Sequence, residues 1–189
     1  MARGPLLWWI VGHRCWACGV SAQADPLLRE GSRLPRPAVL FVCLGNICRS
    51  PLAEAAFRQE AQRRGLEVEI DSAGTGSWHV GHPPDRRAQA VALRNGIDIA
   101  HYRGRQVKPD DFRRFTYIVA LDRSNLADLK RLRPSDGTAE LLLLLDVVEG
   151  RQGKSVADPY YGEDKDFDTT WADAVAGAKG LADLIGGKE

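Results

Sequence analysis

The sequence predicts a single-domain α/β fold in which helices cover both faces of a four-stranded parallel sheet. The chain has 189 residues, enough for one domain with one hydrophobic core. Short apolar segments rich in Val, Ile and Leu alternate with longer segments that carry helical signals, as is typical of βαβ units. The strand segments at residues 38–42, 117–121 and 141–145 are apolar throughout, which indicates burial on both faces of the sheet.

The first part of this pattern is a strand, a helix and a second strand. Residues 38–42 are a continuous apolar run of the buried-strand type. A helix is predicted at residues 52–65, because Pro51 suits a first helical position and Gly65 can end the helix in a left-handed conformation. Residues 66–70 form the second predicted strand.

The middle of the chain continues the same alternation. Asp85 can cap a helix that runs to Arg94 and stops at an Asn-Gly pair. A third strand is predicted at residues 117–121, followed by a helix at residues 124–132 and a fourth strand at residues 141–145. Helical crossovers between the strands make the sheet parallel.

A last helix is predicted from apolar residues spaced alternately three and four positions apart. The residues on this face are Phe167, Trp171, Ala174, Ala178, Leu181 and Ile185. We expect the face to pack on the sheet. Because ligands of such sheets bind beyond the carboxyl ends of the strands, the turn after residues 38–42 is where chemistry is expected.

Composition excludes several functional classes. Lys and Arg total 26 against 25 for Asp and Glu, so no overall field favours nucleic acid or an acidic membrane surface. No apolar run reaches the roughly 18 residues of a membrane helix. The cysteines all lie in the first quarter of the chain, at Cys15, Cys18, Cys43 and Cys48. A secreted disulfide scaffold would spread them, so we expect reactive thiols in a cytoplasmic protein.

Residues 1–37 differ from the rest of the chain. They hold three tryptophans and scattered Gly and Pro without a helical or strand period, and we interpret them as an N-terminal extension, poorly ordered or translated from upstream of the true start. A possible signal cleavage site follows an apolar run that polar residues interrupt, which argues against secretion. Cys15 and Cys18, with His13 nearby, supply too few ligands for zinc and are interpreted as incidental.

The turn after the first strand carries the strongest chemical signal. It reads VCLGNICRSP from residue 42, with five residues between Cys43 and Arg49. A loop that enters a helix N-terminus directs backbone N–H groups into one concavity and can bind a phosphate dianion. The same environment favours the thiolate of Cys43, and the Arg49 guanidinium matches two phosphate oxygens. The predicted phosphate-binding residues are Leu44, Gly45, Asn46, Ile47, Cys48, Arg49 and Ser50.

Residues 43–51 resemble the phosphate-binding loop of the low-molecular-weight protein tyrosine phosphatases. The resemblance extends from about residue 39 to near the C-terminus, and further blocks follow in the family's order, namely Asp71 to Thr75 with Trp78, Gly96-Ile97 with His101, and Asp158 to Gly162. Several blocks in register are more specific than one loop. The resemblance implies hydrolysis of phosphotyrosine monoesters without a cofactor or metal, on a sheet of flavodoxin-like order 2-1-3-4 with the loop after strand 1.

The resemblance also implies roles for individual residues. Cys43 attacks phosphorus to form a cysteinyl-phosphate, Arg49 holds the phosphate, and Asp158 protonates the leaving oxygen and then activates water. The side chains that support the loop are Asn46, Ser50, Ser72 and His101. The walls of a cleft for the phosphotyrosine ring are Trp78, Tyr160 and Tyr161. The implied partners are phosphotyrosine proteins or small aryl phosphates, and we expect a monomer or weak dimer.

Cys48 lies in the same loop as Cys43. Peroxide oxidises thiolates first, and a neighbouring thiol can capture the resulting sulfenic acid as a disulfide. We therefore predict a reversible Cys43–Cys48 bridge that protects the nucleophile.

Three other functions fit parts of the pattern. Thioredoxin-coupled arsenate reductases resemble this fold and loop, but they relay oxidation through downstream cysteines, and none follows Cys48 here. Protein-arginine phosphatases resemble the loop with a threonine where Ile47 stands, so Ile47 favours phosphotyrosine. A non-catalytic phosphate-binding module would need no Cys43, Arg49 and Asp158 together, and their joint presence favours an enzyme.

Overall fold

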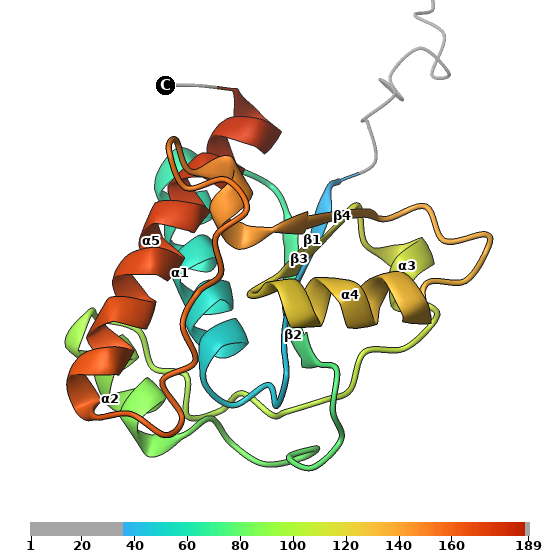
Figure 1. Ribbon diagram of the computed structural model, residues 1–189. Coiled ribbons are helices and arrows are strands. Elements are labelled where there is room, and N and C mark those ends of the chain that lie inside the picture. The colour runs from blue at the N-terminus through green and yellow to red at the C-terminus, as the bar shows by residue number, and fades with distance from the viewer. Residues whose placement is uncertain (1–35, 188–189) are drawn as a thin grey trace, which may run out of the picture. The chain divides into compact units, whose positions relative to one another are not determined.

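The structure, a computed structural model, describes residues 36–187. A parallel sheet at its centre has the order β2-β1-β3-β4 (Figure 1). Its strands are β1 (Ala38–Cys43), β2 (Glu69–Gly74), β3 (Tyr117–Ala120) and β4 (Glu140–Leu143). The predicted α/β fold and strand order are confirmed. The N-terminal segment that includes His13, Cys15 and Cys18 lies outside the described residues, so its interpretation stays a prediction.

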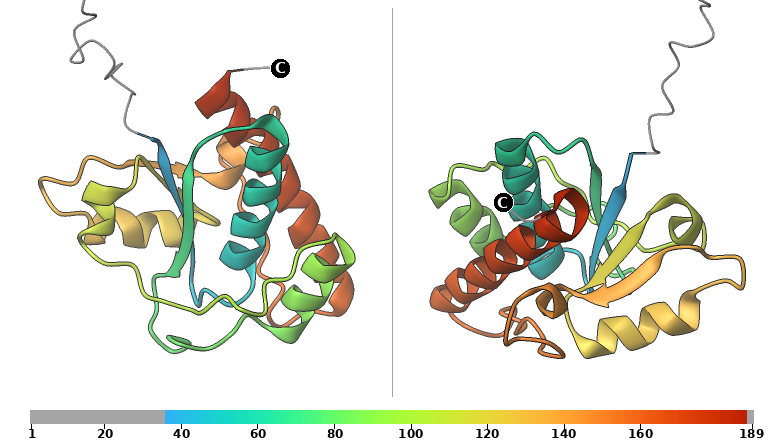
Figure 2. Two further views of the ribbon diagram at one scale, coloured as in Figure 1. Left: turned by 180° about the vertical axis from the view of Figure 1, so that it is seen from behind. Right: turned by 90° about the horizontal axis from the view of Figure 1, so that it is seen from above.

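Helices cover both faces of the sheet (Figure 2). One face carries α1 (Arg49–Arg64), α2 (Arg86–Arg94) and the long α5 (Asp164–Gly186), of which α1 and α5 pack against each other. The other face carries α3 (Asp111–Arg114) and α4 (Arg123–Leu132). Within residues 36–187, no helix has both the length and the apolar character needed to cross a membrane.

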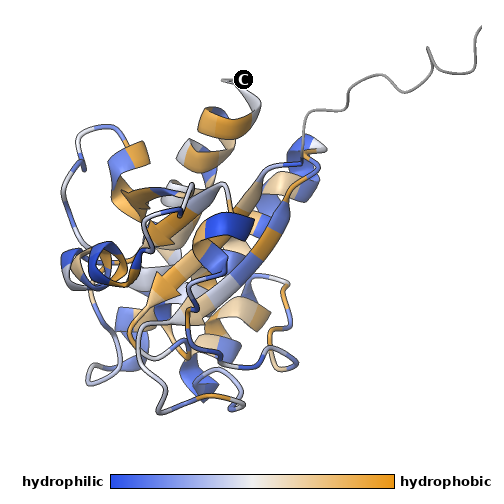
Figure 3. Ribbon diagram, turned by 90° about the vertical axis from the view of Figure 1, so that its right-hand side faces the viewer, coloured by the Kyte–Doolittle hydropathy of each residue, from blue (hydrophilic) through white to orange (hydrophobic). Residues whose placement is uncertain are grey.

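The central strand β1 is buried on both sides and divides the hydrophobic core in two. Val39, Phe41 and Cys43 face the helices α1, α2 and α5, and the alternate residues of β1 face α3 and α4. The hydropathy colouring shows largely apolar strands at the centre and helices in which polar and apolar residues alternate (Figure 3). Because Cys43 is the last residue of β1, the core holds the start of the following turn at the carboxyl edge of the sheet.

The second strand begins later than predicted, at Glu69. Gly65 ends α1 with φ 65°, and the next three residues return the chain to the sheet before Glu69 N–H donates to Pro37 O at 2.9 Å. Leu66 and Val68 pack on the core without strand pairing, which explains their apolar character. The strand then extends through polar residues to Gly74, which pairs with the end of β1.

The remaining differences between the predicted and the observed elements are small. The fourth strand ends at Leu143 because the next residues form the 3-10 helix η2 (Leu144–Val147), which packs on α5. The single-turn helix α3 was not predicted. Helix α1 begins at Arg49, so the predicted phosphate-binding turn and the helix overlap by two residues, Arg49 and Ser50.

Candidate active site

The turn between β1 and α1 wraps around the sulfur of Cys43. Asn46 has a φ of 57°, the left-handed conformation that asparagine tolerates, and its backbone N–H donates to Cys43 Sγ at 3.3 Å. Ser50 Oγ lies 3.1 Å from the same sulfur. Gly74 lets the end of β2 lie close to the backbone of this turn, since a Cβ at residue 74 would be 2.8 Å from Leu44 O. Donors at a helix N-terminus stabilise negative charge, so this turn suits both a thiolate and an anionic ligand.

Three of the predicted supporting side chains form one buried network beneath the turn. Asn46 Nδ2 donates to Ser50 Oγ at 2.9 Å and to Ser72 Oγ at 3.0 Å. Asn46 Oδ1 accepts from the backbone N–H of Arg105 at 2.9 Å. Because both ends of the Asn46 amide are bonded, the side chain holds its own residue in the left-handed conformation.

Glu54 extends this network, and sequence reasoning missed it. The Ser72 hydroxyl donates to Glu54 Oε2 at 2.6 Å, and Arg58 Nε donates to Glu54 Oε1 at 2.9 Å. Burial raises the pKa of the Glu54 carboxyl, and the bonds from Ser72 and Arg58 oppose that rise. The available sequence signal is an acidic residue inside the apolar stretch LAEAAF of α1.

His101, the fourth predicted supporting residue, does not join the network, and the structure corrects this expectation. Its side chain is exposed, and its ring packs edge-on against Tyr102 with 4.8 Å between centroids. The backbone N–H of Arg105 occupies the Asn46 oxygen, and Glu54 accepts from Ser72. The loop is therefore supported by a backbone group and a carboxylate rather than by an imidazole.

The Arg49 guanidinium bridges two carboxylates beside Cys43. Its Nη1 donates to Asp122 Oδ2 and its Nη2 to Asp158 Oδ2, each at 2.5 Å. The Arg49 side chain is 4% exposed and that of Asp158 is 44% exposed, so the guanidinium is fixed while Asp158 faces the opening. The structure thus brings Asp158, which is far away in sequence, to the same cavity as Cys43 and Arg49.

Asp122 is a second residue that sequence reasoning missed. It lies two residues after the end of β3, at the same edge of the sheet as Cys43, and its Oδ1 accepts from Asn125 N–H at 2.6 Å as the N-cap of α4. One oxygen of the Asp122 carboxylate therefore caps helix α4, while the other oxygen orients the Arg49 guanidinium. A polar residue at the carboxyl end of a buried strand is the signal that points to it.

A cavity of about 320 Å³ opens above Cys43. The predicted cleft residues Trp78, Tyr160 and Tyr161 all line it, but with exposures of 71%, 39% and 96% they form a rim rather than a buried wall. The rings of Tyr160 and Tyr161 pack edge to face with 4.9 Å between centroids. His79, which was not predicted, also lines the cavity. The volume suits a small aryl group.

Arg87 of α2 ties the segment that carries Asp158 to the rest of the site. Its guanidinium donates to Tyr160 O and Gly162 O, each at 3.0 Å, and lies 4.5 Å from the centre of the Phe167 ring. The same guanidinium binds both oxygens of Asp85, whose backbone N–H donates to Ile47 O in the turn at 2.8 Å. Arg87 and Asp85 therefore connect the Asp158 segment with the turn around Cys43.

These residues can act together on a tetrahedral anion. The turn and Arg49 can bind its oxygens, the Cys43 sulfur can attack its centre, and Asp158 can exchange a proton at the opening. Cys48 also lines the cavity, and its pKa is raised, first by burial and then by Asp85 and by Cys43, so its thiol stays protonated.

Comparisons with known proteins find similarity to one family along most of the chain. The family model for low molecular weight phosphotyrosine protein phosphatase matches residues 38–188. The low molecular weight phosphotyrosine protein phosphatase of Schizosaccharomyces pombe is 48% identical over 132 residues, which cover 68% of this chain and 84% of that protein. The low molecular weight protein-tyrosine-phosphatase YfkJ of Bacillus subtilis is 46% identical over 126 residues, which cover 66% of this chain and 81% of the relative.

Solved structures give the same result. The crystal structure of YfkJ superposes with a TM-score of 0.75 at 40% identity, covering 82% of this chain and 97% of that chain. The crystal structure of a Drosophila arginine phosphatase superposes with a TM-score of 0.73 at 31% identity, covering 77% of this chain and 96% of that chain.

Proposed function

The chain belongs to the low molecular weight phosphotyrosine protein phosphatase family, whose members are phosphoric monoester hydrolases, and we propose that Cys43, Arg49 and Asp158 carry out its reaction. The observation that carries this assignment is the meeting of the three side chains in one cavity, with the Cys43 sulfur inside a turn of N–H and O–H donors. Phosphoryl transfer asks a protein mainly for positioning and charge stabilisation, and this turn supplies both.

The proposed reaction has two steps. In the first, Cys43 Sγ attacks phosphorus, the bond to the tyrosyl oxygen breaks, and Asp158 gives that oxygen a proton. In the second, Asp158 takes a proton from water, whose oxygen attacks the cysteinyl-phosphate and releases inorganic phosphate and the Cys43 thiolate. Ser50, whose hydroxyl lies 3.1 Å from the sulfur, stabilises the thiolate as it leaves.

Arg49 is proposed to change partners when substrate binds. Its two terminal nitrogens now contact Asp122 and Asp158, and a phosphate dianion offers the same forked guanidinium two oxygens. Asp122 lies deeper, with 19% of its side chain exposed, and continues to orient the guanidinium. Asp158 is more exposed and is the carboxylate that is released to face the leaving group.

Substrate comparison tests the proposed function. Purified protein should hydrolyse phosphotyrosine and p-nitrophenyl phosphate. It should hydrolyse phosphoarginine much more slowly, and it should not reduce arsenate. Ile47 on the cavity wall supports phosphotyrosine over phosphoarginine, and the lack of any cysteine after Cys48 argues against an arsenate relay. A higher kcat/KM for phosphoarginine would assign the chain to the activity named for the Drosophila structure.

Several properties of the whole chain are part of this proposal. We propose residues 38–189 as the phosphatase domain and residues 1–37 as an extension outside it, which is supported by the start of the family match at residue 38. The confinement of cysteines to the first quarter of the chain supports a cytoplasmic protein. Phosphotyrosine proteins or small aryl phosphates are its substrates, and it acts as a monomer or weak dimer.

Arg87→Lys should impair the protonation step. A lysine cannot bind Asp85 and two carbonyls of the 158–162 segment at once, so Asp158 will be held less well. Because a misplacement of about 1 Å can cost up to about 100-fold in rate, kcat should fall clearly for phenyl phosphate and less for p-nitrophenyl phosphate, whose leaving group needs little protonation.

Arg86→Lys is the matched control for this prediction. Arg86 is the exposed neighbour of Arg87 on α2. The kcat and KM of the Arg86→Lys protein should equal those of the unchanged protein. An Arg87→Lys protein that lost the same factor on both substrates would show that Arg87 supports the fold and not the placement of Asp158.

Peroxide treatment should produce a Cys43–Cys48 disulfide. Peroxide converts the Cys43 thiolate to a sulfenic acid, and the Cys48 thiol displaces water to form the disulfide. Both cysteines are buried, free and on the wall of one cavity. Mass spectrometry of treated protein should find one internal bridge and recovery of activity with thiol reductant. Direct conversion of Cys43 to sulfinic acid beside a free Cys48 would reject the bridge.

A further inference from the structure

Two loops that are distant in sequence place three basic side chains in a row beside the active site. These side chains are His79, His82 and Arg103, here called the basic row. Gly104 N–H donates to His82 O at 2.9 Å, and Gly81 N–H donates to Gly104 O at 2.8 Å, so the loops are joined by their backbones. The approach needs a glycine at residue 104, because a Cβ there would lie 2.5 Å from His79 O.

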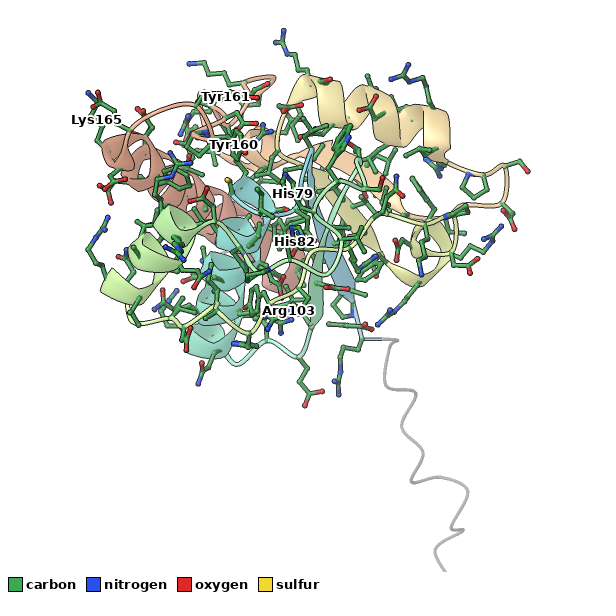
Figure 4. All side chains as sticks on the ribbon, turned by 90° about the horizontal axis from the view of Figure 1, so that it is seen from below. His79, His82, Arg103, Tyr160, Tyr161 and Lys165 are labelled. Atoms are coloured by element: carbon green, nitrogen blue, oxygen red, sulfur yellow. The ribbon has the colours of Figure 1, made fainter. Side chains whose placement is uncertain are left out.

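The basic row begins at the catalytic cavity and leads away from it. His79 lines the cavity together with Tyr160, and the rings of His79 and His82 are 6.0 Å apart between centroids. Seen from below, Tyr160, His79, His82 and Arg103 follow one another across this face (Figure 4). A polypeptide with its phosphotyrosine in the cavity would therefore have flanking residues within reach of the basic row.

The charge of the basic row is not neutralised within the described part of the chain. Arg103 Nη1 donates to the carbonyls of Ala100 and Tyr102 at 2.8 and 2.7 Å, and no carboxylate between residues 36 and 187 pairs with Arg103 or with either histidine. The nearby carboxylates of Asp71 and Asp111 are both bound by Arg105. Arginine is always cationic and each imidazole ring carries an N–H donor, so the row attracts carboxylates.

The other side of the cavity lacks this character. Trp78 separates the catalytic cavity from a second one of about 310 Å³, whose charged residues Asp128 and Arg131 pair with each other. Of these two sides, the side of the basic row is the one that offers an acidic substrate residue an unpaired positive charge.

We propose that the basic row binds acidic side chains next to the phosphotyrosine of a protein substrate, and so selects substrates with Asp or Glu near the phosphorylated residue. The inference rests on the proposed phosphatase function and adds its substrate class. An extended chain advances about 3.3 Å per residue, so the spacing of the two histidine rings corresponds to about two residues. Because the row begins at the cavity wall with His79, the favoured acidic residues lie within the first few positions beside the phosphotyrosine, about two positions apart.

Phosphotyrosine peptides that differ only in charge test the proposal. One set carries glutamates at these positions on the N-terminal side, a second on the C-terminal side, and a third carries glutamines. Release of inorganic phosphate from each peptide gives kcat/KM for the unchanged protein, for His82→Gln/Arg103→Gln and for Arg94→Gln. Arg94, on the opposite end of α2 from the active-site turn and ion-paired with Asp168, provides the same charge change away from the row.

We expect one of the two glutamate peptides to exceed the glutamine peptide by about fivefold in kcat/KM, the size of a surface ion pair or two, with the difference reduced in high salt. The double variant should lose this preference, and Arg94→Gln should keep it. Equal rates for all peptides, or a preference that survives in the double variant, would overturn the proposal. Rates on p-nitrophenyl phosphate separate this result from failure of the proposed function, because His82 and Arg103 lie outside the cavity and their loss should leave those rates unchanged.

Discussion

Cys43→Ser should reduce hydrolysis of p-nitrophenyl phosphate by about 10⁴- to 10⁶-fold, as expected when a covalent nucleophile is removed. A serine hydroxyl is not ionised by the Asn46 N–H and the Ser50 hydroxyl that contact the Cys43 sulfur, and within residues 36–187 no histidine is hydrogen-bonded to that sulfur to act as a base. Stopped assays at high protein concentration would measure the residual rate.

Phosphate binding controls for misfolding of the Cys43→Ser protein. The backbone N–H groups of the turn and the Arg49 guanidinium remain, so calorimetric titration with inorganic phosphate should still detect binding. Bound phosphate with no hydrolysis would identify the sulfur as the reacting atom. Undiminished hydrolysis by this variant would remove Cys43 from the mechanism and would leave the turn as a phosphate-binding module only.

The fold could be predicted where local pattern and burial agree. Residues 38–42 are apolar on both faces of a strand, and the structure buries all of β1. Residues 66–70 misled because Leu66 and Val68 are buried by packing rather than by strand pairing, and apolar character alone does not distinguish the two. The polar residues that extend β2 to Gly74 are determined by pairing with β1, which is a long-range contact.

The site could be predicted where residues lie in one local motif, and less well where distant segments meet. The turn from Cys43 to Ser50 is continuous in sequence, so the spacing of its residues is enough to predict a phosphate-binding site. The sequence offers only weak signals for Asp122 and Glu54, because their roles are set when β3 and α1 pack beside that turn. His101 fails as a supporting residue because the Asn46 oxygen is taken by a backbone N–H, and sequence patterns contain no information on that choice.

Asp158→Asn should lower kcat for phosphotyrosine and phenyl phosphate by about 10²- to 10⁴-fold, the usual contribution of a general acid. Asparagine has the shape of aspartic acid, and its oxygen can still accept from Arg49 Nη2, but its amide has no acidic proton to transfer to the leaving oxygen. For p-nitrophenyl phosphate the loss should be smaller, because that leaving group departs as an anion. Asp168→Asn, an exposed aspartate paired with Arg94, should behave as the unchanged protein.

The dependence on leaving group separates the two roles that the structure allows for Asp158. If Asp158 served only to hold Arg49 through their 2.5 Å contact, its loss would disturb phosphate binding by the same factor for every substrate. If it donates a proton, the loss must grow as the leaving oxygen becomes more basic, and the pH profile of kcat must lose the limb that reports the acid. A series of aryl phosphates that differ only in the ring substituent tests both expectations, because the phosphoryl group, Arg49 and the Cys43 sulfur are constant throughout the series. A uniform loss across the series would assign the acid to another group, and Asp158 would then be a positioning residue for Arg49.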